Sequence, residues 1–230
     1  MNIQKKIQAL VEGMLEVYRN RHELKILSNN VIRGESKDSS TEFENLFGIM
    51  IGELFGCEYT ILVGYQIQMY FNDWKSFKKP DILVYKNTTL EIECIFDLKN
   101  DIGRYPNNWF LEANYWLSDF LKAGSYRYTL KNDKNHIYLT INGELSYFLI
   151  LLNRQNSRDK LLNYSRELRI KKRSDSTIKR FNYFILMNPK SLNAYKSIKE
   201  GDVCDKKNIR EWKRLERHLG KWVKKCYTSI

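Results

Sequence analysis

The chain has 230 residues with a formal net charge of +12, and 43% of its residues are hydrophobic. This length suits one substantial domain, and the hydrophobic fraction excludes global disorder. No run approaches the ~18 apolar residues of a membrane span, and residues 1–14 lack the apolar core of a signal peptide. The four cysteines are scattered without a CxxC pair, so we expect reduced thiols, a cytoplasmic location and no membrane association.

The charge is unevenly distributed along the chain. Residues 153–230 contain 22 Lys and Arg against 8 Asp and Glu, a net charge of +14, whereas residues 1–152 contain 17 against 19, a net charge of −2. Such asymmetry indicates a polyanionic partner, although a lysine-rich, solubilising surface would have the same composition. We expect a single domain over residues 1–230, with a core at about 40–152 and residues 153–230 as a DNA-binding subregion.

The first third of the chain predicts two helices, a strand and a loop. Apolar residues at helical spacing define both helices, with Ser40 and Thr41 able to cap the second helix and Gly56 able to end it. A continuous apolar run defines the strand. In chain order these elements cover residues 4–18, 40–55, 60–71 and 72–79.

The rest of the chain, apart from one hairpin treated below, predicts a helix, three strands and a basic helix. In order they cover residues 109–122, 136–141, 144–152, 181–187 and 206–226. Asn142-Gly143 predicts a hairpin between the first two of these strands, and residues 100–108 and 154–180 are predicted loops. This order predicts an α/β (α+β) fold with a mixed central β-sheet flanked by helices.

The stretch from Pro80 to Lys99 predicts a β-hairpin, because two apolar runs flank a turn-like segment at residues 86–89. Side chains of the second strand alternate between two faces. One face is predicted to be apolar and the other acidic. The apolar face comprises Leu90, Ile92, Cys94, Phe96 and Leu98, and the acidic face comprises Glu91, Glu93, Ile95, Asp97 and Lys99. A row of carboxylates repels itself unless a cation lies on it, and a divalent metal is the natural candidate.

Pro80-Asp81 followed by Asp97-Leu98-Lys99 resembles the PD-(D/E)xK nuclease superfamily, which includes type II restriction endonucleases, resolvases and repair nucleases. The resemblance implies a restriction-endonuclease-like core: a helix, a three-stranded antiparallel meander, a second helix and a further strand. The order predicted over residues 40–152 fits this core. The motif is short, so the strand context of Asp97 and Lys99 is what favours it.

Phosphodiester hydrolysis needs an activated water and neutralisation of the charge that develops at phosphorus. Mg²⁺, with Mn²⁺ as a substitute, can supply both. Asp81 and Asp97, on adjacent strands, can bind one ion, and the resemblance implies the Leu98 carbonyl as a further ligand. Lys99 would orient or deprotonate the water and stabilise negative charge. Two such close carboxylates raise each other's pKa, so metal binding should release protons.

Further candidates surround this motif. The resemblance implies Glu44 as an additional metal ligand and catalytic residue, but helix capping and the helix dipole also explain a glutamate there. Glu42 and Glu53 are alternatives for the same role. Glu93 could bind a second ion, and Arg104 could contact a phosphate.

The predicted C-terminal helix has an apolar stripe for core packing and a strongly basic side. A strip of cations on a helix is typical of contact with a phosphate backbone; an anionic membrane is the less favoured alternative. The predicted nucleic-acid-binding residues on this helix are Arg210, Lys213, Arg214, Arg217 and Lys221.

Together these features predict a Mg²⁺-dependent DNA endonuclease, specifically a type II restriction enzyme that acts on double-stranded DNA as a homodimer. One alternative is another nuclease with the same core: a repair or mobile-element nuclease, a toxin or an RNase. The other is a nucleic-acid-binding protein in which the acidic hairpin is structural.

Overall fold

The computed structural model describes residues 2–23, 26–28, 31–32, 39–99, 109–123, 125–129, 136–141, 145–153, 181–187 and 206–223. Within these ranges the helices are α1 (Ile3–Glu23), α2 (Ser39–Phe55), α3 (Trp109–Lys122) and α7 (Lys206–Leu219). None of these described helices is long and apolar enough to cross a membrane.

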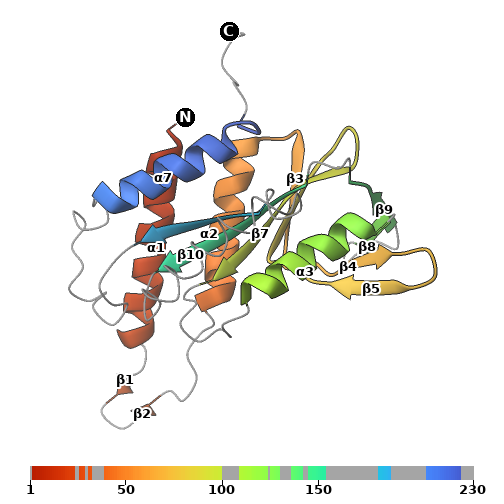
Figure 1. Ribbon diagram of the computed structural model, residues 1–230. Helices are drawn as coiled ribbons and strands as arrows, with labels where there is room; N and C mark the ends of the chain where they lie inside the picture. The colour runs from red at the N-terminus through yellow and green to blue at the C-terminus, as the bar shows by residue number, and fades with distance from the viewer. Residues whose placement is uncertain are drawn as a thin grey trace.

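The strands form a central sheet, a second sheet and a small hairpin (Figure 1). The five-stranded central sheet has the order β11-β10-β7-β6-β3. Its strands are β3 (Tyr59–Val63), β6 (Ile82–Lys86), β7 (Glu91–Lys99), β10 (Ser146–Asn153) and β11 (Phe181–Met187). β7, β10 and β11 are parallel, whereas β3, β6 and β7 pair antiparallel. The predicted mixed central sheet is therefore confirmed.

The second sheet is antiparallel and has the order β5-β4-β8-β9. Its strands are β4 (Ile67–Tyr70), β5 (Lys75–Lys78), β8 (Ser125–Thr129) and β9 (His136–Leu139). The small hairpin, β1 (Ile26–Ser28) with β2 (Val31–Ile32), was not predicted.

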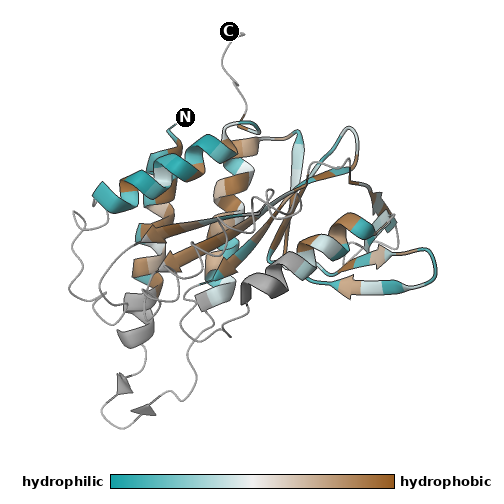
Figure 2. Ribbon diagram, in the orientation of Figure 1, coloured by the Kyte–Doolittle hydropathy of each residue, from teal (hydrophilic) through white to brown (hydrophobic). Residues whose placement is uncertain are grey.

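Both faces of the central sheet are buried under other elements. α1, α2 and α7 cover one face, and the residues between form a first core cluster that includes Ile7, Phe47, Phe96, Phe148 and Trp212. α3 and the second sheet cover the other face, and the residues between form a second core cluster that includes Leu83, Ile95, Leu117, Tyr126 and Leu149. Hydropathy follows these layers, since the strands of the central sheet are largely hydrophobic and α7 is largely hydrophilic (Figure 2).

Two glycines shape the chain around β3: Gly48 at its contact with α2, and Gly64 directly after it. A Cβ at Gly48 would lie only 2.6 Å from Val63 Cγ2, so this glycine lets the helix approach the strand closely. Gly64 follows β3 with a φ of +60°, a left-handed conformation that favours glycine. There the chain leaves the central sheet and enters the second sheet, so the predicted single strand over residues 60–71 is wrong. The loop predicted over residues 72–79 is wrong as well, because it contains β5.

Several further predictions differ from the structure or lie outside the described residues. β9 and β10 lie in different sheets, so the hairpin predicted at Asn142-Gly143 is wrong, and that turn lies outside the described residues. Strand β8 was not predicted. α7 ends at Leu219, earlier than predicted, and the loops predicted over residues 100–108 and 154–180 lie outside the described residues.

The β6–β7 hairpin is present, with a β-bulge in β7. Val84 pairs with Cys94 but Tyr85 pairs with Ile92, which leaves Glu93 as an extra residue in β7. A bulge reverses the alternation of side chains on its two sides. Accordingly Cys94 lies in the first core cluster and Ile92 in the second, so the prediction that both share one face is wrong.

Candidate active site

Three of the predicted catalytic side chains meet where β6 begins and β7 ends. Ile82 pairs with Phe96, and Asp81 lies one residue before that pair. Asp81 Oδ2 accepts a hydrogen bond from the Leu98 backbone N–H at 2.6 Å and lies 3.4 Å from Lys99 Nζ. Lys99 Nζ also forms an ion pair with Asp97 Oδ1. The structure thus brings the two carboxylates and the lysine into direct contact.

This cluster is part-buried rather than enclosed. The side chains of Asp81, Asp97 and Lys99 are 22–23% exposed, so a small ligand can reach them. The Gly64 N–H donates a hydrogen bond of 2.8 Å to the Asp81 carbonyl, which fixes the backbone at the beginning of β6. The backbone therefore holds one of the two carboxylates rigidly.

The pKa of Asp81 is raised from 3.8 to about 7. Burial is the main cause, because it penalises the charged form, and the negative charge of Asp97 adds to it. The Lys99 charge and the Leu98 N–H oppose the shift, and a hydrogen bond shared with the Asp97 carboxyl strengthens it. Asp81 therefore exchanges its proton near neutral pH. The neighbouring carboxylate contributes to this shift as predicted, but burial is the larger cause.

Tyr147 is a component of the site that the sequence did not reveal. Its hydroxyl donates a hydrogen bond of 3.1 Å to Asp97 Oδ2, and its side chain is only 2% exposed. Burial and the charge of Asp97 raise its pKa well above the usual value, so the hydroxyl stays protonated. A buried tyrosine needs a polar partner, but only the parallel register of β10 on β7, with Tyr147 opposite Ile95, identifies that partner as Asp97.

Glu44 lies close to the site on the neighbouring helix without joining the two aspartates. A Cβ at Gly64 would lie 3.7 Å from Glu44 Oε2, which places this carboxylate beside the strand end that contacts Asp81. Within the described ranges, however, no three His, Cys, Asp or Glu side chains form a group that could hold a metal ion. The pair Asp81 and Asp97 still provides the hard oxygen ligands that Mg²⁺ prefers, of which it commonly uses only one or two.

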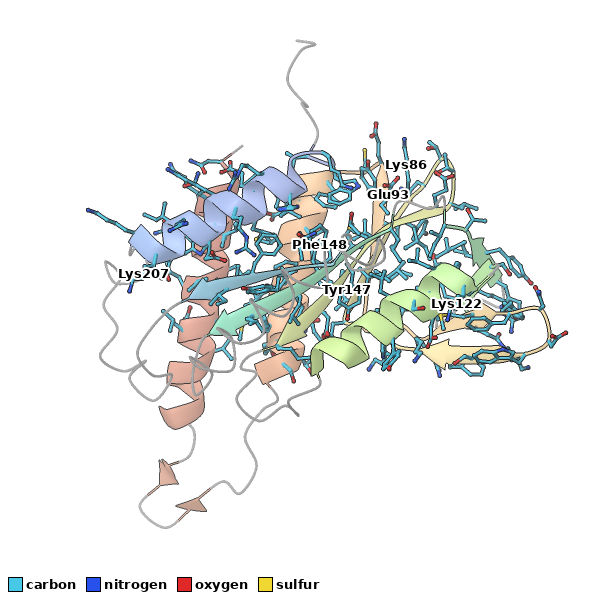
Figure 3. All side chains as sticks on the ribbon, viewed as in Figure 1. Lys86, Glu93, Lys122, Tyr147, Phe148 and Lys207 are labelled. Atoms are coloured by element: carbon cyan, nitrogen blue, oxygen red, sulfur yellow. The ribbon has the colours of Figure 1, made fainter. Side chains whose placement is uncertain are left out.

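Glu93, a predicted ligand for a second ion, lies elsewhere. Its Oε2 accepts a hydrogen bond of 3.1 Å from Nε1 of Trp222, and Trp222 belongs to the first core cluster. Four residues of strand also separate Glu93 from Asp97, about 13 Å at the rise of a β-strand, whereas paired metal ions lie about 4 Å apart. Figure 3 labels Glu93, which lies on β7, and Tyr147, which lies on β10. The structure therefore does not bring Glu93 to the aspartate pair.

The basic side of α7 borders a shallow groove against α1 with a volume of about 690 Å³. Three predicted nucleic-acid-binding residues, Arg210, Lys213 and Arg217, line it together with Lys206. On the α1 side, Gln4 donates a hydrogen bond of 2.8 Å to Glu216. The groove thus has four cationic side chains and one carboxylate along its lining.

The other predicted basic residues have different surroundings. Arg214 donates a hydrogen bond to the Tyr183 carbonyl, pairs with Glu211 and lies over the Phe184 ring, so it anchors α7 to β11. Lys221 donates to Ser146 Oγ at 3.2 Å. Arg104 lies outside the described residues.

The groove and the aspartate pair lie on opposite faces of the central sheet but near the same end of it. Asp97 pairs with Leu149, which pairs with Tyr183, the residue that Arg214 contacts. Arg214 is therefore level with Asp97 along the strands. Arg214 contacts Tyr183, whereas Trp212 Nε1 donates a hydrogen bond to the carbonyl of Leu186, so α7 runs antiparallel to β11. Because β11 is parallel to β10 and β7, Arg210 lies further toward the carboxyl ends of these strands.

Comparisons with known proteins do not assign the chain to a family. No protein-family model matches the sequence, and no curated protein matches it.

Proposed function

We propose that the protein is a Mg²⁺-dependent endonuclease that hydrolyses phosphodiester bonds in double-stranded DNA, with a PD-(D/E)xK site. The contact of Asp81, Asp97 and Lys99 at one strand end is the observation that supports this most strongly. Further support comes from the central-sheet strands and two helices, which follow the order α2, β3, β6, β7, α3, β10 once the inserted strands of the second sheet (β4, β5, β8 and β9) are left out. That order is the one that the resemblance implies.

Asp81 and Asp97 would hold the metal ion, with the Leu98 carbonyl and Glu44 as further candidates. When bound, Mg²⁺ supplies Lewis-acid stabilisation of the charge that develops on the phosphoryl oxygens. The chain itself supplies orientation: Tyr147 and Lys99 fix the Asp97 carboxylate from two sides. The Lys99 ammonium can then hold a water by a hydrogen bond and stabilise negative charge at the phosphate.

The basic groove of α7 is suited to the phosphate backbone of the same duplex. It lies near the end of the sheet where Asp97 and Lys99 are found, so a duplex crossing this end could contact both. Each cation that contacts a duplex phosphate contributes about −0.9 to the slope of log K against log salt. Replacing Lys213 with glutamine should therefore weaken DNA binding and reduce that slope by about 0.9.

The direct test is plasmid cleavage with Mg²⁺ by Asp97→Asn and Lys99→Ala. Loss of a charged group that acts on the transition state typically slows an enzyme by roughly 100-fold or more. Lys86→Ala is the matched control, because Lys86 lies at the far end of the same hairpin. We expect wild-type cleavage by the control, loss of cleavage by both site variants, and loss of wild-type cleavage in EDTA. Undiminished cutting by Lys99→Ala and Asp97→Asn would eliminate the site.

The product pattern tests the enzyme class. A type II restriction enzyme gives discrete fragments, and we expect it to act as a homodimer that cuts each strand with one site. Sedimentation of the protein with and without cleavable DNA measures that assembly. A smear of products, or preference for RNA or branched DNA, would instead indicate another nuclease with the same core.

A non-catalytic nucleic-acid-binding protein is the second candidate. The observation in its favour is that Lys99 already pairs with both aspartates, as in a structural ion-pair cluster. It predicts salt-dependent DNA binding without cleavage under any metal condition.

A further inference from the structure

Among the described residues, other elements pack against only one face of the second sheet. Ile67, Met69, Tyr126 and Leu139 point from it into the second core cluster. Because side chains alternate along a strand, the residues between them point to the opposite, outer face. These outer-face residues include Gln68, Tyr70, Lys75, Phe77, Arg127 and Tyr138.

Four of these side chains form a row across all four strands. Phe77 pairs with Gln68, Gln68 pairs with Arg127, and Arg127 pairs with Tyr138. Three strand spacings separate the two rings at the ends of the row, about 14 Å. The rings are accessible, since Phe77 is 53% exposed and Tyr138 is 56% exposed.

The centre of the row is held by polar contacts. Gln68 Oε1 accepts hydrogen bonds from the Tyr70 hydroxyl at 2.9 Å and from the Arg127 guanidinium. That guanidinium also lies 5.5 Å from the centre of the Tyr70 ring. Gln68 is only 6% exposed, so the polar centre is fixed before any ligand arrives.

The chemistry of this face is aromatic and cationic. None of the four strands contains Asp or Glu, whereas Lys75 and Arg127 supply positive charge. At the turn between β4 and β5, Trp74 is 57% exposed and stacks on Phe71 at 3.9 Å between ring centres. Flat rings with interspersed cations, on strands that lack carboxylates, complement the bases and phosphates of unpaired nucleotides.

We propose that the outer face of the second sheet binds a single strand of nucleic acid, with unpaired bases stacked on Phe77 and Tyr138. This inference goes beyond the proposed function, because it adds a surface for unpaired nucleotides to a protein whose proposed substrate is a duplex. A single strand fits better than a duplex, since bases inside a duplex are stacked on each other and cannot reach the rings. β5 is joined to the active site by Lys79 and Pro80 alone, so a strand on this face has a short path to Asp81.

The test is fluorescence anisotropy of a labelled oligothymidylate, measured in EDTA so that nothing is cleaved. Loss of one stacking ring weakens binding by about 1–3 kcal/mol, roughly 5- to 150-fold in Kd. We expect this loss for Phe77→Ala and for Tyr138→Ala, with unchanged circular dichroism. Tyr115→Ala is the matched control, because Tyr115 is an exposed aromatic residue, 66% accessible, on α3. We expect the control to bind as wild type does.

A salt titration separates stacking from phosphate contact. We expect Phe77→Ala to leave the slope of log K against log salt unchanged, and Lys75→Gln to reduce it by about 0.7, the value for a single-strand phosphate. Unchanged affinity in both ring variants, or equal weakening by Tyr115→Ala, would overturn the inference.

The two proposals fail in different ways. If Lys99→Ala abolishes plasmid cleavage but the ring variants bind oligothymidylate normally, only the binding surface is wrong. If the wild-type protein cleaves no nucleic acid, but Phe77→Ala and Tyr138→Ala weaken the binding of oligothymidylate, the binding surface stands and the nuclease assignment is wrong.

Discussion

The two large sheets of this protein differ in how much of their surface is covered. The central sheet is buried on both faces, and its polar chemistry is concentrated where strands end, at Asp81, Asp97 and Lys99. The second sheet is buried on one face and displays aromatic and cationic side chains over the other. Burial thus determines where the proposed functional groups can lie: the candidate catalytic groups at a strand end, and the proposed binding surface on an open face.

The strand end has a physical advantage for a carboxylate pair. A charged group in the middle of the central sheet would lose its hydration without compensation. At the end of β7 the Leu98 N–H is available to the Asp81 side chain, and Lys99 and solvent reach both carboxylates. The site therefore combines a raised pKa with access for a ligand.

The largest stability effect should come from the interior of the central sheet. Phe96 is fully buried between Phe47 and Phe148, with ring centres at 5.2 and 5.0 Å. Phe96→Ala leaves a cavity and should lower the free energy of unfolding by about 3–5 kcal/mol. Urea denaturation measures this, and a loss below about 1 kcal/mol would contradict the close packing between α2 and the sheet.

The next-largest effect should be an increase in the free energy of unfolding, for the variant Asp81→Asn. Since folding raises the pKa of Asp81 to about 7, the stability contributed by its protonated form is present below pH 3.8 and is lost as the pH rises toward 7. Asp81→Asn removes this loss, so at pH 8 it should raise the free energy of unfolding by on the order of 1–4 kcal/mol. The same variant should lose cleavage activity.

The pH dependence provides the control for this prediction. The advantage of Asp81→Asn over the wild type should be mostly lost at pH 4 and should vanish well below pH 3.8, where Asp81 is protonated in both the folded and unfolded states. Thermal unfolding at pH 4 and pH 8 measures the difference. An advantage that is equal at both values would show that the cause is not the titration of Asp81.

A smaller effect should follow from the hydrogen bond that reaches the site from β10. Tyr147→Phe removes a donor to a charged carboxylate and should cost about 1.5 kcal/mol at pH 8. The comparison variant is Tyr128→Phe, which removes a bond of 2.7 Å between two neutral hydroxyls and should cost about 1 kcal/mol. Only Tyr147→Phe should also slow cleavage; equal activity in both variants would show that Tyr147 does not orient Asp97.

The smallest effect should come from the open face. Phe77 is 53% exposed, so Phe77→Ala should change the free energy of unfolding by no more than about 0.5 kcal/mol. Paired with Phe96→Ala, this variant separates a ring that stabilises the fold from a ring available for binding. A loss of several kcal/mol would instead show that the face is packed.

Local patterns predicted the parts of the fold that depend on local signals. Helical spacing and capping residues located α2, α3 and the start of α7, and period-two alternation placed Asp97 and Lys99 on one face near Asp81. These features could be predicted because each depends on a few neighbouring residues or on a single tight hairpin.

The sequence could not predict features that depend on distant pairing. Residues 60–71 form one apolar run, but the left-handed Gly64 divides it between two sheets. The bulge at Glu93 leaves no clear signal, because both Ile92 and Cys94 are apolar and either face can bury them. The role of Tyr147 depends on a parallel register set by strands about fifty residues apart, which no local pattern encodes.

The turn at residues 87–90 closes the β6–β7 hairpin at the end opposite to Asp81 and Asp97. Its residues are exposed, and the bulge lies between this turn and the carboxylates. A lengthened turn would therefore add chain far from the reactive end without shifting the alignment of the two aspartates. This turn is the natural attachment point for a fluorophore or an affinity tag that reports on the hairpin in binding and cleavage assays.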